Sequence, residues 1–95
     1  MEKLPTDTAS ALALLDYPNR FPLKVLGKKS AEFEAIVVAL VKARCPQNEH
    51  IEVRKRESKK GKYVALTLTF TAHSQQQIED IYGDLYDCDD VSMSL

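Results

Sequence analysis

The chain has 95 residues, of which 44% are hydrophobic and 28% are charged, and its formal net charge is −1 at pH 7. A chain of this size and composition forms one ordinary globular domain and is too short for a second hydrophobic core. It contains no apolar run near the roughly 18 residues that span a bilayer, and the short apolar run at 11–15 lacks the flanking features of a signal peptide, so we expect a cytoplasmic protein without membrane contact.

The N-terminal segment is polar and shows no hydrophobic periodicity. We therefore expect residues 1–12 to form a disordered tail and residues 13–95 to form a single domain. At this boundary, residues 11–16 allow one helical turn, which Pro18 would end because proline does not continue a helix.

A strand and a helix are predicted next. An apolar residue occupies every second position of 21–25, which predicts a strand that Gly27 ends. Ser30 is a suitable N-cap for a helix that ends before Pro46. Apolar residues recur in this helix at steps of three and four: Phe33, Ile36, Val37, Leu40 and Val41. This spacing predicts one buried face.

Two further strands joined by a tight turn follow. The second predicted strand contains Ile51 and Val53 and is almost wholly basic by Arg56. The sequence Ser-Lys-Lys-Gly at 58–61 predicts a turn, because glycine adopts a positive φ at the lowest cost. Over 63–71, apolar side chains alternate with mostly hydroxyl-bearing ones, which predicts a third strand with one apolar face.

A second helix and a last strand complete the pattern. Ser74 and Gln77 match a capping box, in which each side chain satisfies a free amide at the helix start. The apolar stripe of this helix consists of Ile78, Ile81, Tyr82 and Leu85. Residues 91–95 alternate apolar residues with serines, which predicts a fourth strand.

The order of these elements predicts the fold. Each helix has one apolar stripe and each strand one apolar face, so both helices are expected to cover one side of a single sheet. Right-handed crossovers then give an antiparallel sheet with the strand order 4-1-3-2. The sequence therefore predicts an α+β fold, the ferredoxin-like βαββαβ sandwich.

Four residues of types that bind zinc are present, Cys45, His50, His73 and Cys88. Their spacing matches no known ligand pattern. In the predicted topology Cys88 lies at the opposite end of the sheet from the others, about 17 Å away. We therefore expect no metal site and no cofactor, and the wide separation of the two cysteines along the chain favours reduced thiols.

Catalytic residues are not expected either. Cys45 and His50 are residue types that act as nucleophile and base, but a lone cysteine before a proline usually contributes to packing. The acidic cluster Asp87, Asp89 and Asp90 would bind a cation weakly at most, since it lacks the glycine and the glutamate of an EF-hand loop. We therefore expect a protein that is not an enzyme.

The charges are divided along the chain. Residues 20–62 carry 12 basic and 5 acidic side chains, whereas residues 63–95 carry 6 acidic and no basic ones. The basic side chains of the predicted hairpin 54–62 form a candidate basic surface: Arg54, Lys55, Arg56, Lys59, Lys60 and Lys62. Such a hairpin can contact RNA phosphates. Lys62 and Val64 occupy the aromatic positions of an RNA-recognition motif, so its stacking platform is absent and nucleic acid is not the expected partner.

A second candidate site precedes the first helix, where free backbone amides favour an anion. Its residues are Gly27, Lys28, Lys29 and Ser30. Helix capping by the serine and solvation of the lysines explain the same residues without a ligand.

Several short motifs occur in one order along the chain: LLDYP at 14–18, FP at 21–22, KVLG at 24–27, SKKGKY at 58–63, Ser74 with Gln77, IY at 81–82 and VSMSL at 91–95. Together they resemble the YbeD-like proteins, a small bacterial family. The resemblance implies a ferredoxin-like fold similar to ACT regulatory domains and no established biochemical activity. It also implies an effector site near the turn after the first strand. The chain departs from the family in its longer polar N-terminus and its basic second strand.

Three functions are compatible with this pattern. The leading hypothesis is a non-catalytic binding or regulatory module that self-associates or docks on a partner protein through the exposed edges of the second and fourth strands. The first alternative is an ACT-like sensor of a small-molecule effector at Gly27, Lys28, Lys29 and Ser30. The second is weak nucleic-acid binding through the hairpin 54–62.

Overall fold

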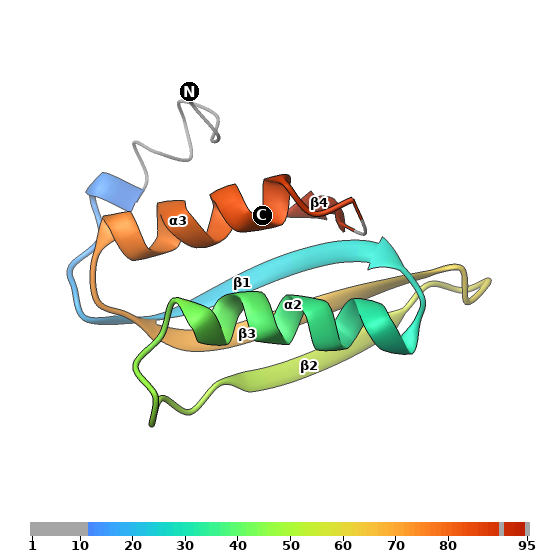
Figure 1. Cartoon of the computed structure of the whole chain (residues 1–95), viewed down its shortest axis with the longest axis horizontal. Coiled ribbons are helices and arrows are strands. Elements are labelled where there is room, and N and C mark those ends of the chain that lie inside the picture. Colours follow the sequence, from blue (N-terminus) through green and yellow to red (C-terminus); the bar gives the residue numbers. More distant parts are fainter. Residues whose placement is uncertain (1–11, 90, 95) are drawn as a thin grey trace.

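The structure, a computed structural model, describes residues 12–89 and 91–94. Its elements are β1 Asn19–Lys28, α2 Ala31–Ala43, β2 Glu52–Glu57, β3 Tyr63–Ala72, α3 Gln75–Tyr86 and β4 Val91–Ser94. Figure 1 shows how they are arranged. The predicted order of strands and helices is confirmed. Of the tail predicted at 1–12, only Leu12 falls within the described residues, and Leu95 of the predicted last strand lies outside them.

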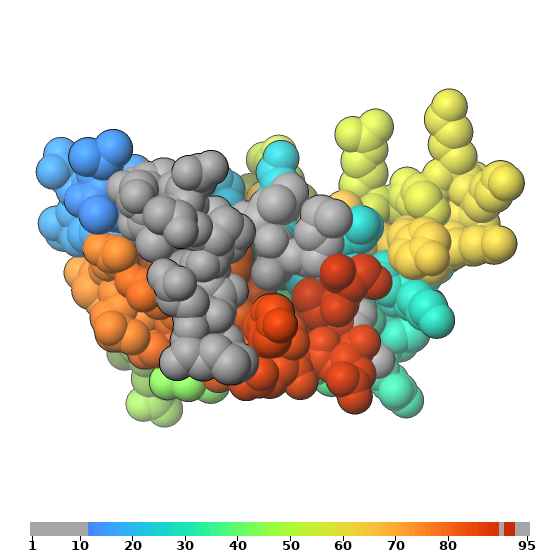
Figure 2. All heavy atoms as spheres, turned by 90° about the horizontal axis from the view of Figure 1, so that it is seen from above, coloured from blue at the N-terminus to red at the C-terminus, as the bar shows by residue number. Residues whose placement is uncertain are grey.

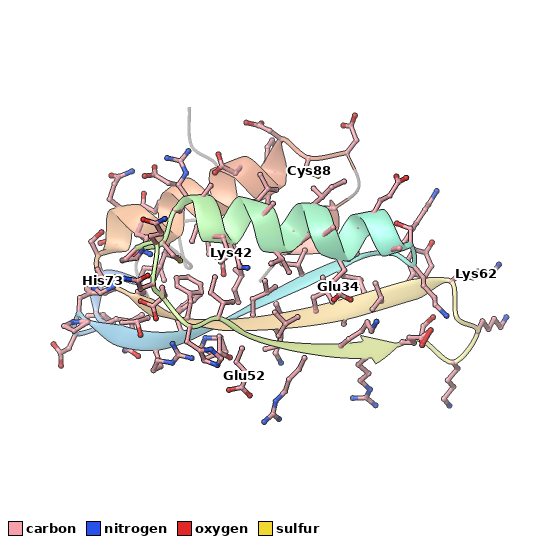
Figure 3. The ribbon with its side chains drawn as sticks, turned by 60° about the horizontal axis from the view of Figure 1, so that its bottom comes forward. Glu34, Lys42, Glu52, Lys62, His73 and Cys88 are labelled. Carbon is pink, nitrogen blue, oxygen red and sulfur yellow. The ribbon has the colours of Figure 1, made fainter. Side chains whose placement is uncertain are left out.

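All four strands form one antiparallel sheet in the order β2-β3-β1-β4. This is the predicted order 4-1-3-2 counted from the other edge. Both helices lie on one side of the sheet, as Figure 3 shows, and the other side is open. The ferredoxin-like fold predicted from the element order is therefore confirmed.

The two central strands form the longest ladder. β1 and β3 pair over their whole lengths, from Asn19 opposite Ala72 to Lys28 opposite Tyr63. Every second residue of β3 is buried from Val64 onward, which confirms the predicted alternation. The prediction that the first strand ends at Gly27 is wrong by one residue, because β3 is long enough to pair with Lys28 as well.

Both helices begin at the predicted serines. The Ser30 hydroxyl accepts a hydrogen bond from the Phe33 amide at 3.0 Å, and the Ser74 hydroxyl accepts one from the Gln77 amide at 3.1 Å. Each bond satisfies one of the amides left free at a helix start. The helix residues that become buried all belong to the predicted stripes: Phe33, Val37 and Val41 in α2, and Ile78, Ile81, Tyr82 and Leu85 in α3.

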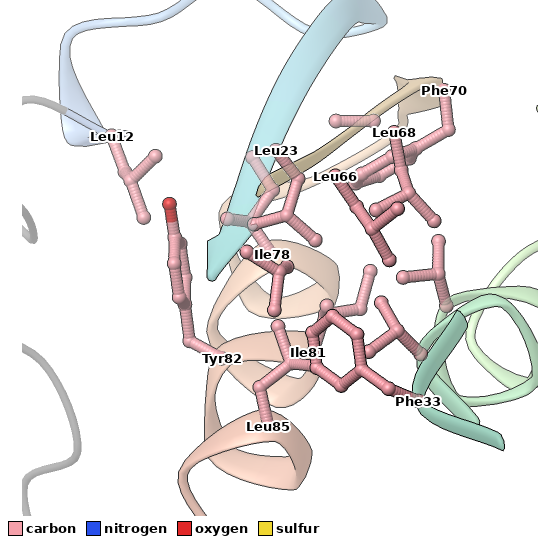
Figure 4. Close-up of a cluster of buried hydrophobic side chains, with 14 of the residues drawn as sticks. Leu12, Leu23, Phe33, Leu66, Leu68, Phe70, Ile78, Ile81, Tyr82 and Leu85 are labelled. Atoms are coloured by element: carbon pink, nitrogen blue, oxygen red, sulfur yellow. The ribbon is translucent and has the colours of Figure 1, made fainter. Parts of the chain in front are cut away.

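The core fills the space between the helices and β1 and β3, as Figure 4 shows. Leu12 belongs to it and is only 3% exposed. Figure 4 places its side chain beside the ring of Tyr82 at the margin of the core. Leu12, which the prediction placed in the tail, is therefore part of the core. Among the described helices, none is long and apolar enough to cross a membrane.

Candidate functional site

The strand β2 lies at one edge of the sheet and pairs only with β3. All six of its residues are exposed. The prediction of a buried apolar face on this strand is wrong, since Val53 remains 36% exposed although it lies opposite the buried Leu68. The physical reason is that the two helices pack over β1 and β3 and leave the edge uncovered.

The two sides of β2 differ in what they present. Residues opposite the buried side chains of β3 face the helix side, and these are Val53, Lys55 and Glu57. The residues on the open side are Glu52, Arg54 and Arg56. Figure 3 shows Glu52 on the side of the sheet away from the helices, and Glu34 on the side that α2 occupies. The basic run of β2 is therefore divided between two surfaces.

On the helix side, the charges of β2 are neutralised by Glu34 of α2 and by Lys29, which lies two residues before that helix. The Lys55 ammonium lies 3.2 Å from a carboxylate oxygen of Glu34. Glu57 forms an ion pair with Lys29. The hydrogen bond from Lys29, together with its charge, holds the pKa of the Glu57 carboxyl below its ordinary value. These pairs take the place of apolar packing between β2 and α2.

On the open side, the cations are largely unneutralised. Arg54 donates to Glu52 at 3.1 Å, but its side chain is 80% exposed. Within the described part of the chain, Lys24 and Arg56 have no ion-pair partner. Lys24 lies in the same row as Arg54, with Thr67 between them. The open face beside β2 is therefore positively charged and rich in hydroxyl groups.

The turn that joins β2 to β3 extends this positive surface. Gly61 has a φ of 68°, and its amide donates to the Ser58 carbonyl at 3.0 Å. Figure 2 shows the side chains of this hairpin standing clear of the body at one end of the molecule. Five of the six residues predicted for the basic surface remain on the turn or the open side, whereas Lys55 is held by Glu34.

The start of β2 is fixed by an arginine that sequence analysis missed. The Arg20 guanidinium donates to the Thr69 carbonyl at 3.2 Å and to the His50 carbonyl at 3.3 Å. It also lies 3.5 Å from a carboxylate oxygen of Glu49. Because these partners are about 30 and 49 positions away in the sequence, only the register of the sheet brings them together. Arg20 therefore holds the segment just before the edge strand, and the Lys29 ion pair holds Glu57, the last residue of that strand.

The candidate site before α2 has a different geometry from an open ligand loop. Gly27 is buried within β1, and Lys28 is the last residue of that strand. The Lys29 side chain pairs with Glu57, and its amide donates to the Lys62 carbonyl at 2.9 Å. The Ser30 hydroxyl caps α2. Three of the four candidate residues therefore have structural roles.

A hollow of about 310 Å³ lies between the end of α2 and the start of β2. It is lined by Lys42, Cys45, Pro46, Gln47, Glu49 and Ile51. Burial raises the pKa of the Cys45 thiol above its ordinary value, although a hydrogen bond from Gln77 acts in the opposite direction. At neutral pH this cysteine is a thiol and a weak nucleophile. Among the described residues, no hydrogen bond joins the Cys45 thiol and the His50 imidazole.

The comparisons with known proteins place this architecture in a family. The family pattern of DUF493, described as a protein of unknown function, matches residues 13–95. The chain belongs to the DUF493 family. It is 42% identical to a UPF0250 protein of Chromobacterium violaceum over 72 residues, which are 76% of this chain and 81% of that protein. The predicted resemblance to the YbeD-like proteins is thus confirmed.

A further relative supports the DUF493 assignment, and a solved structure supports the fold. A UPF0250 protein of Nitrosomonas europaea is 35% identical over 83 residues, covering 87% of this chain and 95% of that protein. The solution structure of protein HP0495 from H. pylori is similar with a TM-score of 0.73, at 15% identity, over 97% of this chain and 94% of that one. The likeness to HP0495 shows the fold alone.

In this DUF493 protein, the four residues weighed as zinc ligands do not converge. His73 lies at one end of α3 and Cys88 just beyond the other, and Figure 3 shows them well apart. A helix of 12 residues separates them by about 18 Å. No group of three or more His, Cys, Asp or Glu side chains suited to a metal ion occurs among the described residues.

Proposed function

We propose that this DUF493 protein is a non-catalytic binding module whose edge strand β2 receives an extended, acidic segment of a partner protein as an additional strand. The observation that carries the proposal is the exposure of all six β2 residues at the edge of the sheet. An exposed edge presents unpaired amide and carbonyl groups that an extended segment can satisfy. The anchors at both ends of β2 keep this edge extended before the segment arrives.

The charge of β2 favours an acidic segment over a second copy of the same edge. Three consecutive cations, Arg54, Lys55 and Arg56, occupy the middle of the strand. Antiparallel pairing of two β2 strands centred on Lys55 would set Arg54 opposite Arg56 and Lys55 opposite its own copy. Like charges directly opposite each other destabilise a strand pair. An acidic segment converts the same row into favourable pairs.

The side chains that were considered as catalytic groups support binding and not catalysis. Cys45 is held as a thiol by its partly buried surroundings. The acidic residue Asp84 of α3 has a structural role, since it accepts two hydrogen bonds from the Arg44 guanidinium at 2.8 and 3.1 Å and so joins the two helices. Our proposal therefore rests on the edge strand β2, which pairs with β3 on one side only.

A peptide titration tests this function. The probe is a seven-residue synthetic peptide, Thr-Glu-Thr-Glu-Val-Thr-Thr, labelled for fluorescence anisotropy. We compare two analogues in which backbone amides are N-methylated at either the odd or the even positions. Because alternate amides of a strand point to opposite edges, one analogue should lose binding and the other should keep it. Equal affinities of both analogues would show that the peptide does not add as a strand.

The matched protein variants change the same charge at two places in the hairpin. Arg54→Glu with Arg56→Glu reverses the two open-side cations of β2, whereas Lys59→Glu with Lys60→Glu reverses two cations in the turn. We expect at least a tenfold loss of peptide affinity in the first variant and a much smaller loss in the second. Equal losses would assign binding to the net charge of the hairpin, as for a polyanion such as RNA, and contradict the edge-strand proposal.

A further inference from the structure

The two sides of the β2 edge restrict the sequence that can pair with it. We infer that the bound segment carries two acidic residues separated by one neutral residue, with an apolar residue next to one of the acids. This inference rests on the proposed function and adds the pattern that the partner segment must have. It follows from which β2 side chains are free and which already have partners.

Strand pairing determines which side chains meet. Residues directly opposite each other on paired strands point to the same side of the sheet, for parallel and antiparallel segments alike. Segment residues on the open side therefore meet Arg54 and Arg56, and those on the helix side meet Val53 and Lys55. Residues two apart on a strand are separated by about 6.6 Å, so two acids with one residue between them match the two arginines.

The open side favours acids at these two positions. Arg56 has no carboxylate partner among the described residues, and Arg54 shares its guanidinium only with the exposed Glu52. Glu52 also limits the pattern, because an acid placed opposite it would meet a like charge. The favourable positions for acids are therefore opposite Arg54 and Arg56.

The helix side disfavours acids at the intervening position. Lys55 is already paired with Glu34, and the next helix-side residue toward the turn is the carboxylate Glu57. An acid directed to this side would compete with Glu34 for Lys55. Val53 instead offers exposed apolar surface beside the half-buried Ile51. The residue opposite Val53 is therefore best apolar, and the one opposite Lys55 neutral.

The test compares peptides of identical composition. Thr-Glu-Thr-Glu-Val-Thr-Thr places both acids on one side of the added strand, and Thr-Glu-Glu-Thr-Val-Thr-Thr places them on opposite sides. We expect about fivefold tighter binding of the first peptide, the order of one favourable cross-strand charge pair. Equal affinities would overturn the inferred pattern and leave strand addition standing. No measurable binding of either peptide, with a dissociation constant above the millimolar range, would contradict the proposed function itself.

Two protein variants test whether the difference in affinity between the two peptides comes from the named side chains. Glu34→Gln frees Lys55 from its partner, so it should improve binding of the peptide with adjacent acids and narrow the difference between the two peptides. Arg54→Gln should weaken the alternating peptide and leave the other less affected, because with valine opposite Val53 only the alternating peptide places a glutamate opposite Arg54. Glu32→Gln is the control, because Glu32 lies in the same first turn of α2 as Glu34 and is exposed. If Glu34→Gln behaved like this control, the helix-side argument would be wrong.

Discussion

Gln77 shows how one side chain can join two segments that are distant in the sequence. Its carbonyl oxygen accepts a hydrogen bond from the His73 amide at 2.7 Å. Its amide nitrogen donates to the Arg44 carbonyl at 3.0 Å and lies 3.6 Å from the Cys45 sulfur. The predicted capping box therefore differs in detail, since Gln77 caps the amide of His73 and not that of Ser74. The end of α2 is tied to the start of α3 by this residue.

Replacing Gln77 by alanine removes these bonds and leaves the His73 amide without its acceptor. We expect the free energy of unfolding to fall by about 1 kcal/mol. Gln76→Ala is the control, because Gln76 bonds only to the exposed Asp80 among the described residues, one turn along the same helix. Urea titrations of both variants measure the difference. Equal losses of unfolding free energy in the two variants would show that the hydrogen bonds of Gln77 do not stabilise the fold.

Leu12 and Leu14 provide a matched pair at the N-terminal margin. Leu12 is buried against the core, whereas Leu14 is 86% exposed. Leu12→Ala should lower the free energy of unfolding by about 2 kcal/mol, because it leaves a cavity beside the core. Leu14→Ala should change it by less than about 0.5 kcal/mol. If both variants unfolded at the wild-type urea midpoint, Leu12 would not belong to the core in solution.

At the scale of elements, the hairpin of β2 and β3 shows how local turn chemistry positions the edge strand. The Ser58 amide donates to the Tyr63 carbonyl at 3.0 Å, which closes the hairpin around the turn. Gly61 adopts its positive φ in open space, with no atom within 4 Å of the position that a Cβ would occupy. Backbone conformation alone, and not crowding, therefore requires glycine there.

Gly61→Ala tests this explanation. The alanine side chain meets no neighbour, so the cost of the left-handed conformation should appear alone, as a loss of about 1 kcal/mol in the free energy of unfolding. Gly61→Asn should cost less, because asparagine tolerates this conformation better than alanine. The two variants are compared by urea titration. An alanine variant as stable as wild type would mean that the turn adopts another conformation.

At the scale of the whole molecule, both helices cover the same side of the sheet, and the core lies between them and the sheet. The open side carries Lys24, Arg54 and Arg56, and the turn adds further cations. The acidic residues after position 62 all lie in α3 or the segment that follows it. The stability of the molecule therefore depends on the single apolar layer between sheet and helices. Tyr82 closes one margin of this layer and is 4% exposed.

The ionisation of Tyr82 predicts how global stability depends on pH. Burial raises the pKa of its phenol from 10.0 to about 12, so the folded chain holds this proton more tightly than the unfolded chain. Its contribution is fully present below pH 10 and is lost as the pH rises toward 12. The loss should reach about 2 to 3 kcal/mol in the free energy of unfolding. Tyr82→Phe should remove this part of the alkaline slope, and an unchanged slope in that variant would contradict the assignment.

The local patterns of the sequence determined the elements and the fold. The alternation in β3, the stripe of α3 and the serines that cap both helices depend on residues at most a few positions apart, so they can be recognised without tertiary structure. The order of these elements, combined with right-handed crossovers, then predicts a single sheet topology. The candidate basic surface was predicted for the same reason, as a continuous run in the chain.

Only the tertiary structure decided which of these residues are available. Lys29 and Lys55 look as free in the sequence as Arg56 does, yet both are neutralised by Glu57 and Glu34. The exposure of β2, the anchor at Arg20 and the burial of Leu12 depend likewise on which strands the helices cover and on the register between distant strands. Such contacts depend on distances in space, which the spacing of residues along one chain does not contain.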